Sequence, residues 1–398
     1  MLANGTNQRL TDMLLIFNFE FIILNLQKRF IVAGNFIDGT GAPVRRNVFL
    51  AVQDGIITGI GPAADLPHIA GAAIDDLKHC TIVPPLVDCS VSLSRSPAVD
   101  PKVRLADDET GLAEKTALVA QHIRYCHSHG VLGVANSDDS IGLVEHLQEI
   151  MPERLSIDIR KSGRDFLRIV YSTLSDEGEA PDSKLNPEDL NRILQQRGDK
   201  KGVVVANGPQ LVQEALAAGC DAIEQGYDMG EENLREMAEK DVLWIPNVLI
   251  AKNGMDNAGS GGAVSCRFSM RYVAPGKADP GAEVFWKKML AAQLGQLRLA
   301  RKLGVKTAVG TGAGGVGILH GESMVEEMKL FIKAGYTLEE TIRCASVNGA
   351  GFYSMENLGA LTVGRKATFL VARGTVQLLP RKLSYLKSIY VDGAPYKN

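Results

Sequence analysis

The chain contains 398 residues, 45% of them hydrophobic, and is therefore long enough to bury the core of one large domain with a small appendage. Its 43 basic and 46 acidic residues are spread along the sequence and give a net charge of −3. This balance provides no cationic face for phosphate backbones or lipid headgroups, so nucleic acid and membrane surfaces are not expected as partners.

The N-terminal segment is apolar from Met13 to Leu26, but Asn18, Glu20 and Asn25 interrupt it. It is shorter than the roughly 20 apolar residues that span a bilayer, and no basic start with a cleavage site marks it as a signal peptide. We interpret residues 1–28 as an N-terminal extension, either an extra strand or helix or sequence upstream of the folded part.

The cysteines are scattered and include no C-x-x-C pair, which argues against a zinc knuckle and against a disulfide framework. They are Cys80, Cys89, Cys126, Cys220, Cys266 and Cys344. Free cysteines suit a reducing compartment, and we therefore expect a cytoplasmic protein.

Both ends of the folded part have the pattern of a β domain. From Arg29 to about Pro84, short strand-like runs alternate with glycines and the hairpin signal Asp54-Gly55. Near the C-terminus, Ala367–Ala372 and Tyr385–Val391 return to this pattern. Two β-rich ends around a long middle predict one composite β-sandwich built from residues 29–84 and 356–398.

The middle, residues 85–355, alternates β-branched runs with helical patterns, as parallel strands joined by crossover helices do. Eight such runs predict an α/β fold, a (β/α)8 TIM barrel, although the link between the third and fourth runs is too short for a full helix. The predicted strands are Ile82–Asp88, Val131–Asn136, Leu155–Arg160, Phe166–Tyr171, Gly202–Ala206, Asp221–Gln225, Val242–Asn247 and Val305–Gly310.

The connection Ala251–Pro280 contains Asn-Gly, Gly-Ser-Gly-Gly and Pro-Gly. It follows the seventh predicted strand, on the face where barrels build their sites. Long glycine-rich loops there often act as lids, and a surface insertion is an equally good interpretation.

Two clusters of polar residues have both a functional and a structural interpretation. His122, Cys126 and His129 share one helical face and resemble a metal-binding stripe, but imidazoles late in a helix also complement its dipole, and we favour this structural role. Asp138 and Asp139 could pair as acid and base, although two solvated acids are the simpler account.

Two glycine-rich segments resemble phosphate loops. Gly312 to Gly317 spells G-x-G-x-x-G after a strand, but no acidic residue closes the βαβ unit of a dinucleotide site. An anion cradle of backbone N–H groups and an ordinary flexible loop both stay open there. Gly359 to Lys366 matches only in spacing, and we interpret it as the turn that enters the C-terminal strands.

Several longer motifs, read together, are more specific. Phe36-Ile-Asp-Gly-Thr-Gly is followed by Val52-Gln-Asp-Gly-Ile-Ile-Thr-Gly-Ile-Gly. Further motifs are Thr81-Ile-Val-Pro-Pro-Leu-Val-Asp-Cys, Ala206-Asn-Gly-Pro, Ala217-Ala-Gly-Cys-Asp-Ala-Ile-Glu-Gln-Gly, Val309-Gly-Thr-Gly-Ala-Gly and Leu358-Gly-Ala-Leu-Thr-Val-Gly-Arg-Lys-Ala. From Arg29 onward the chain resembles the amidohydrolase superfamily, in its imidazolonepropionase-like branch.

That resemblance implies a metal site at the barrel mouth. In the family, a His-x-His after the first strand, a carboxylated Lys or a Glu on the fourth, one His each on the fifth and sixth and an Asp on the eighth hold one or two divalent metals such as zinc. A bound metal lowers the pKa of its water from about 15.7 to about 7 and polarises the scissile carbonyl. The implied activity is hydrolysis of carbon–nitrogen bonds other than peptide bonds.

In this chain every one of those positions carries another residue. The positions fall on Ser90, Ser92, Arg168, Val205, Gln225 and Gly312. Hydroxyls are poor zinc ligands, valine and glycine have no side-chain donor, and a guanidinium is permanently cationic. We therefore expect no metal site and no cofactor, and whether the chain is an enzyme stays open.

Arg168 also changes the expected charge of the mouth, because it would offset carboxylates such as Asp88 or Glu224 and favour anions. His320 matches a histidine retained in the resembled branch and is the first candidate for ligand contact, followed by Tyr171 and Glu224. A capping or packing role is equally open for each. Gln225, Gly312 and Gly314 complete the predicted ligand-binding set with Arg168.

Three functions are compatible with these residues. The first is a degenerate amidohydrolase that binds a small molecule or pairs with an active relative. The second is a metal-free hydrolase, with Cys89, Asp88 and His320 as weak catalytic candidates, since nothing in the sequence shows a base beside Cys89. The third is an anion binder that uses Arg168 and the glycine loop. The resembled family is often oligomeric, so a homo-oligomer is expected by analogy.

Overall fold

The computed structural model describes residues 28–68, 72–99, 111–137, 157–173, 185–260 and 280–396, together with 182–183 and three single helical positions, 142, 144 and 147. Residues 1–27 of the predicted extension, Asp138, Asp139, Cys266 and most of the predicted glycine-rich connection lie outside these ranges. So does the beginning of the third predicted strand.

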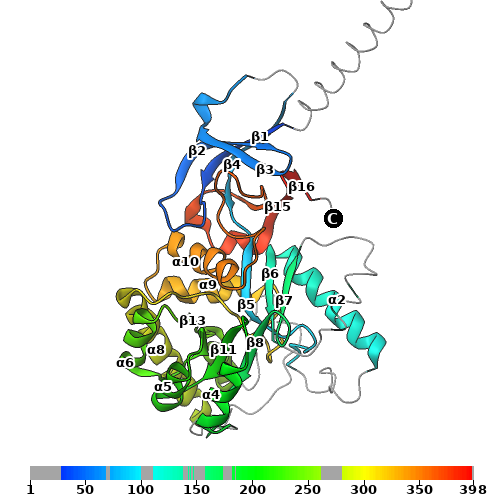
Figure 1. Ribbon diagram of the computed structural model, residues 1–398. Coiled ribbons are helices and arrows are strands. Elements are labelled where there is room, and N and C mark those ends of the chain that lie inside the picture. Colours follow the sequence, from blue (N-terminus) through cyan, green and yellow to red (C-terminus); the bar gives the residue numbers. More distant parts are fainter. Residues whose placement is uncertain are drawn as a thin grey trace, which may run out of the picture.

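Both ends of the described chain join in one mixed sheet, the blue and red domain at the top of Figure 1. β4 connects them, because it pairs in parallel with β1 and antiparallel with β14. The order is β16-β15-β14-β4-β1-β2-β3. The strands are β1 (Arg29–Phe36), β2 (Arg45–Gln53), β3 (Ile56–Pro62), β4 (Ala73–Val83), β14 (Phe369–Arg373), β15 (Leu386–Val391) and β16 (Ala394–Pro395). The predicted composite β domain is therefore formed by both chain ends.

Alternating apolar residues give this sheet its core. Ile31, Leu50, Ile82 and Phe369 come from four different strands and are fully buried in one cluster. The turn between β2 and β3 has positive φ at Asp54 (53°) and Gly55 (76°), the conformation of the predicted hairpin.

The second part of the molecule is built on parallel strands. They are β5 (Leu86–Val91), β6 (Val131–Asn136), β7 (Asp158–Lys161), β8 (Phe166–Val170), β11 (Lys201–Ala206), β12 (Ala222–Gln225) and β13 (Leu243–Ile245). They form two sheets, β5-β6-β7 and β8-β11-β12-β13. The first predicted strand is divided, because Pro84 and Pro85, which lack N–H donors, separate β4 from β5.

The eighth predicted strand is not a ladder strand, but its segment still lies between the two sheets. Trp244 of β13 bonds to both Lys306 and Ala308 through the backbone, and Cys89 N–H bonds to Val309 O at 3.0 Å. Between β7 and β8 there is a single bridge, Ser162 to Phe166. The described residues are therefore arranged as a TIM-type α/β fold without one continuous closed ladder.

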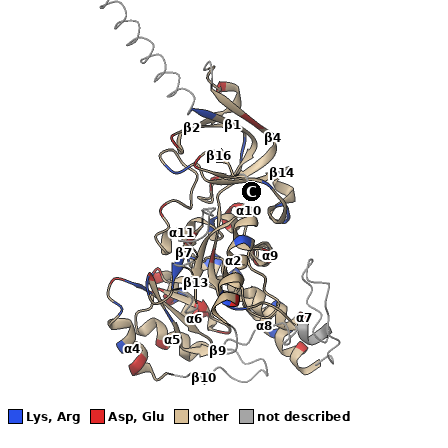
Figure 2. Ribbon diagram, turned by 90° about the vertical axis from the view of Figure 1, so that its right-hand side faces the viewer, with Lys and Arg blue, Asp and Glu red and all other residues tan. Residues whose placement is uncertain are grey.

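Helices cover the outside of these strands (Figure 1). They are α2 (Leu112–Ser128), α4 (Pro187–Gln195), α5 (Pro209–Ala217), α6 (Gly230–Glu239), α7 (Val248–Ser260), α8 (Pro280–Leu303), α9 (Ser323–Lys333), α10 (Leu338–Cys344) and α11 (Val347–Phe352). Shorter elements are β9 (Ser172–Thr173), β10 (Asp182–Ser183) and the 3-10 turns η1 (Ala63–Asp65), η2 (Val376–Leu378) and η3 (Arg381–Tyr385). Basic and acidic residues are intermixed along the described helices (Figure 2). Within the described ranges, every helix is too short or too polar to cross a bilayer.

α7 corrects the prediction of a loop that begins at Ala251, since residues 251–260 are helical. Gly254, part of the Asn-Gly turn signal, serves close packing instead. A Cβ at this position would lie 2.5 Å from the Trp286 ring of α8. The glycine thus lets two helices approach rather than ending one.

A buried carboxylate holds the first turn of α7. Glu327, on α9, accepts hydrogen bonds from the N–H groups of Val248 at 2.8 Å and Leu249 at 2.7 Å. The Tyr227 hydroxyl accepts from Ala251 N–H at 3.2 Å. These acceptors satisfy donors that a helix leaves without partners at its N-terminus. Burial raises the pKa of Glu327 to about 8, while the two backbone hydrogen bonds act in the opposite direction.

We predict that Glu327→Gln changes how stability depends on pH. Between pH 4.5, the ordinary pKa of a glutamate, and about 8, the folded protein holds a proton at Glu327 that the unfolded chain has released. The free energy of unfolding therefore falls as the pH rises through this window, by roughly 1.4 kcal/mol for each pH unit. Urea unfolding across the window should show a flatter dependence in the variant, and equal slopes would contradict the assignment.

Candidate functional site

Three polar side chains meet at the carboxyl ends of β5, β8 and β12. Ser90 Oγ donates a hydrogen bond to Glu224 Oε1 at 2.6 Å. Arg168 donates two to the same carboxylate, from Nε to Oε2 at 2.6 Å and from Nη2 to Oε1 at 2.9 Å. Ser90 and Arg168 occupy two positions at which the resemblance implies metal ligands.

The pair of Arg168 and Glu224 is largely buried, with side chains 18% and 3% exposed. Burial acts to lower the pKa of Arg168, but the adjacent Glu224 carboxylate outweighs it and raises the pKa above the usual value. The guanidinium therefore stays charged. Two parallel hydrogen bonds to one carboxylate are a geometry that arginine provides and lysine does not.

Asp88 adds a second carboxylate next to this pair. Oδ1 accepts from the N–H groups of Thr311 at 2.9 Å and Ser90 at 3.2 Å, and Oδ2 accepts from the Thr311 hydroxyl at 2.6 Å. Burial raises the pKa of Asp88 to about 6, and the hydrogen bonds from Thr311 and Ser90 oppose that rise. Asp88 thus joins β5 to the segment that replaces the eighth strand.

Amide side chains lie at or just beyond the ends of β11, β12 and β13. Asn207 donates to Gln225 Oε1 at 2.7 Å and accepts from Tyr227 N–H at 3.0 Å. Asn247 Nδ2 donates to Gly310 O at 3.0 Å, while its Oδ1 is buried without a hydrogen-bond partner among the described residues. Gln225 and Asn247 have φ of 72° and 44°, a conformation that is costly for residues other than glycine.

Most backbone N–H groups of the glycine-rich loop bond within the protein, which disfavours the anion cradle, one of the two interpretations that the sequence left open. Within the described structure, the N–H groups of Gly312, Gly314, Gly315 and Gly317 bond to carbonyl oxygens of Ser90, Ile318, Gly312 and Pro97. A Cβ at Gly314, whose φ is 94°, would lie 2.5 Å from Ser92 O. These glycines therefore pack the loop against the end of β5.

His320 has the packing role that the sequence left open. Its Nε2 bonds to Ser92 O at 3.0 Å, and its ring stacks on His122 with centroids 3.7 Å apart and planes 12° apart. His122 Nδ1 bonds to Leu93 O at 2.8 Å. Because carbonyl oxygens only accept, these ring nitrogens are the donors. The two imidazoles join the loop, α2 and the end of β5.

The three α2 residues that resemble a metal stripe have different surroundings, in line with the structural role that the sequence favoured. His122 and Cys126 are buried, whereas His129 is partly exposed and its Nδ1 bonds to Tyr125 O near the end of the helix. In the part of the chain that is described, no three His, Cys, Asp or Glu side chains come together as a metal-binding group.

Cys89 lacks the surroundings of a nucleophile. Burial, followed by the nearby charges of Asp88 and Glu224, raises the pKa of its thiol well above the ordinary value. The thiolate is the nucleophilic form, so this shift disfavours attack. His320 is engaged at Ser92, and the contacts therefore do not support Cys89, Asp88 and His320 as a catalytic set.

Two other predicted residues lie beside the cluster rather than in it. The Tyr171 hydroxyl donates to Glu214 on α5. Val205 is buried on β11, directly paired with Glu224 on β12, and adds only an apolar surface.

Sequence reasoning missed Thr311, Asn247 and Lys161. Thr311 stands inside the Val309-Gly-Thr-Gly motif, and Asn247 ends the seventh predicted strand, so their positions alone could have drawn attention to them. Lys161 is 6% exposed at the end of β7, a burial that is rare for lysine.

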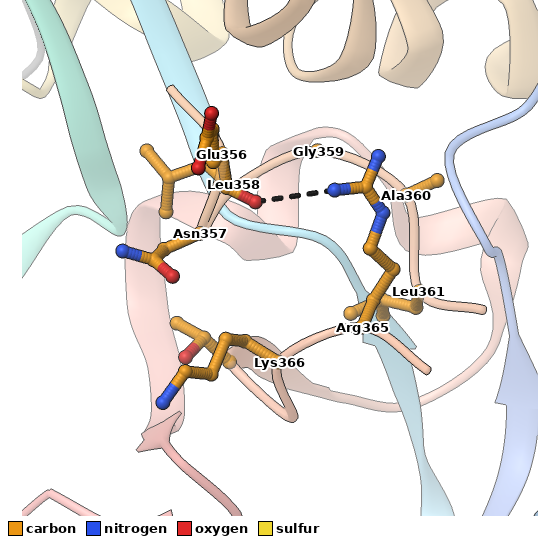
Figure 3. A pocket seen from close by; sticks show the side chains of 9 residues that line it. Glu356, Asn357, Leu358, Gly359, Ala360, Leu361, Arg365 and Lys366 are labelled. Atoms are coloured by element: carbon orange, nitrogen blue, oxygen red, sulfur yellow. Dashed lines mark hydrogen bonds between the residues drawn. The ribbon is translucent and has the colours of Figure 1, made fainter. Parts of the chain in front are cut away.

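The turn from Gly359 to Lys366 lines a shallow recess of about 200 Å³ that is open to solvent (Figure 3). Arg365 donates to Glu356 O at 3.3 Å, and Lys366 pairs with Asp392 at 3.1 Å. Both cations already have partners, and neither is buried. These contacts agree with the interpretation of Gly359 to Lys366 as a turn.

A family model described as "Amidohydrolase family" matches residues 192–395, just over half of the chain. The chain belongs to the amidohydrolase family. No curated protein matches its sequence.

Solved structures show the same amidohydrolase-type fold at low identity. A Xaa-Pro dipeptidase with methionine in its active site has a TM-score of 0.75 at 19% identity and covers 93% of this chain and 100% of its own. An ochratoxinase from A. niger has a TM-score of 0.71 at 17% identity, covering 94% and 96%. Molinate hydrolase has a TM-score of 0.72 at 14% identity, covering 93% and 95%.

The mouth of this amidohydrolase does not offer a donor set that fits a divalent metal. The Glu224 carboxylate is held by Arg168 and Ser90, and the Asp88 carboxylate by Thr311. Arg168 would repel a cation placed against Glu224. The residues that are present therefore stabilise one another.

We predict that Arg168→Met destabilises the fold by roughly 3–5 kcal/mol, because it leaves the Glu224 charge buried without its partner. The double variant Arg168→Met/Glu224→Met should recover most of that loss, since it removes the charge as well. Chemical denaturation measures both.

A matched control is Arg192→Met, the same substitution in an exposed pair with Asp189. It should cost less than about 1 kcal/mol. Equal losses in the free energy of unfolding of Arg168→Met and Arg192→Met would contradict the importance of the buried pair.

Proposed function

We propose that this chain keeps the amidohydrolase fold without its divalent-metal site, is inactive as a metal-dependent hydrolase, and uses the barrel mouth to bind a small molecule. The two hydrogen bonds from Arg168 to Glu224 are the observation that carries this proposal. They put a permanent positive charge at a position where the family places a metal ligand.

The other replaced positions support the same proposal. Ser90 donates to Glu224, Gln225 accepts from Asn207, and Gly312 has no side chain. A protein that makes metal-bound hydroxide needs imidazole or carboxylate donors that are available to the metal. In this mouth, the carboxylates that come together are already saturated by protein donors.

A finer family placement is also part of the proposal. The motifs quoted for the sequence favour the imidazolonepropionase-like branch, whereas the structural neighbours reported above are named as a dipeptidase and as hydrolases of ochratoxin and molinate. A cytoplasmic location and a homo-oligomer, or a pair with an active relative, stay predictions.

A metal-free hydrolase of carbon–nitrogen bonds is the second candidate, and the hydrogen bond from Ser90 Oγ to Glu224 is the observation that favours it. A hydroxyl bonded to a carboxylate has the arrangement of a nucleophile with its base. Both oxygens of Glu224 also accept hydrogen bonds from Arg168, however, so this carboxylate is not free to act as a base. The binding function is therefore the better supported of the two.

Metal analysis of protein purified without chelator tests the first proposal. We expect well below one equivalent of zinc, manganese or iron after incubation with each metal and removal of the excess. An active amidohydrolase treated identically is the positive control. A stoichiometric ion that is retained by the wild type would overturn the proposal, because it would require donors that this account assigns to protein contacts.

Hydrolysis assays with lactams, dipeptides and cyclic ureas test the second candidate. We expect no turnover above background, because both oxygens of Glu224 are engaged by Arg168. Turnover that is abolished in Ser90→Ala but retained in Cys89→Ala would establish the second candidate instead. Loss of turnover in Cys89→Ala would instead indicate that the buried Cys89 thiol takes part in the reaction.

A further inference from the structure

The end of α2 is where the barrel meets the C-terminal strands of the β domain (Figure 1). Gly130 follows the helix, and a Cβ there would lie 2.6 Å from Leu370 of β14 and 2.9 Å from Leu386 of β15. Tyr396 follows β16, and its ring centroid lies 4.6 Å from that of His127 in the last turn of α2. Because α2 ends just before β6 begins, this contact lies at the amino ends of the parallel strands, away from the mouth.

His127 is a buried imidazole in this contact. The residue is 1% exposed, and its Nε2 has no hydrogen-bond partner among the described residues. The Tyr396 ring packs against it with the two planes 57° apart. Burial lowers the pKa of His127 below the ordinary value of a histidine and is the only cause of that shift. The ring is therefore neutral in the folded protein near pH 7.

The charged side chains of the neighbouring elements do not compensate for a proton on His127. On β15, Lys387 donates to the Cys80 thiol and Tyr390 to the Asp75 carboxylate. Arg373, at the end of β14, is exposed, and β6 contains no titratable residue. Because charges contribute nothing to the pKa shift, the described groups leave an imidazolium here without an opposite charge.

The carbonyl groups at the end of α2 do not compensate for it either. Tyr125 O accepts from His129 N–H at 3.2 Å and from His129 Nδ1 at 2.8 Å, and His127 O accepts from Gly130 N–H at 2.9 Å. A helix C-terminus favours a cation through carbonyl oxygens that lack partners, and these oxygens have them. A protonated His127 would carry N–H groups at both ring nitrogens, with Nε2–H buried away from any described acceptor.

β16 is the part of this contact that separates most easily. It has two residues and, in the described sheet, pairs with β15 alone. Tyr396 N–H adds one hydrogen bond, to Ile389 O at 2.7 Å. A short edge element with few partners opens at a lower free energy than the core of a sheet. A cost placed on the His127 contact therefore acts first on β16 and Tyr396.

We infer that the contact between His127 and Tyr396 is an acid-sensitive joint, in which protonation of His127 releases β16 and Tyr396 from the end of α2 while the rest of the sheet stays folded. The joint goes beyond the proposed function, because it lies outside the mouth. In the released state His127 has the ordinary pKa of 6.5. Below pH 6.5 the released state therefore binds a proton that the closed state excludes, and its population rises by up to about tenfold for each pH unit.

Amide hydrogen exchange of the full chain, followed by mass spectrometry and corrected for the intrinsic rate at each pH, tests the joint. From pH 7.5 to 5.5 the protection of the Tyr396 amide should fall about three- to tenfold. The internal control is the Ile57 amide, which bonds to Arg365 O at 2.9 Å near the other edge of the same sheet. Its protection should stay the same at both pH values.

Variants assign the effect to one imidazole. His127→Phe keeps a ring against Tyr396 without a titrating group, so its Tyr396 protection should be equal at pH 7.5 and 5.5. His129→Phe is the matched control, because His129 follows the same helix and is only partly buried. It should keep the pH dependence of the wild type. The comparison of Tyr396 with Ile57 needs only the wild type, so it decides the inference even if His127→Phe fails to fold.

Equal protection of the wild-type Tyr396 amide at both pH values would overturn the inference. An equal loss at Ile57 and Tyr396 would do so as well, because it would indicate a general acid destabilisation of the sheet. A pH dependence that persists in folded His127→Phe, or that disappears in His129→Phe, would show that His127 is not the group that controls β16.

Discussion

The buried contact between the Arg168 guanidinium and the Glu224 carboxylate is the interaction on which the rest of the mouth depends. A carboxylate that is 3% exposed has lost most of its water and needs a compensating charge. Arg168 supplies it with two hydrogen bonds, and Ser90 supplies a third from another strand. β5, β8 and β12 are thereby joined through side chains.

Contacts of Asp88 and Gly310 hold the segment after the seventh parallel strand against β5, next to that pair. Val305–Gly310 forms no regular ladder, yet Asp88 accepts hydrogen bonds from both the backbone and the hydroxyl of Thr311 and so attaches this segment to β5. Gly310 is required there, because a Cβ would lie 2.4 Å from Ile245 and 3.0 Å from Ser90. The hydrogen bonds from Thr311 to Asp88 and the close approach that Gly310 permits thus replace part of the backbone ladder between strands.

Periodicity and turn chemistry predicted the composite β domain and seven of the parallel strands, because burial on two faces leaves a strong local signal in runs such as Val131–Asn136. The failures have physical reasons. Gly254 looked like a turn but permits a close helix contact, and the glycines after Thr311 looked like a cradle although their N–H groups bond within the protein. Local sequence does not encode which distant partner a donor finds. The sequence did predict that Arg168 would offset Asp88 or Glu224, but it did not show which of the two carboxylates takes both hydrogen bonds.

A protein can have a given fold without the activity that is common in that fold. The active site depends on a few side chains, whereas the fold depends on the whole core. In this chain buried apolar residues of the parallel strands supply the core, whereas the implied ligand positions carry other residues. In the proposed function, a hydroxyl, a guanidinium and a glycine stand at implied ligand positions, and the side chains at the mouth bond to one another instead of to a cation. Asn247 stands apart from this set, because its Oδ1 is buried without a hydrogen-bond partner among the described residues and its backbone has φ of 44°.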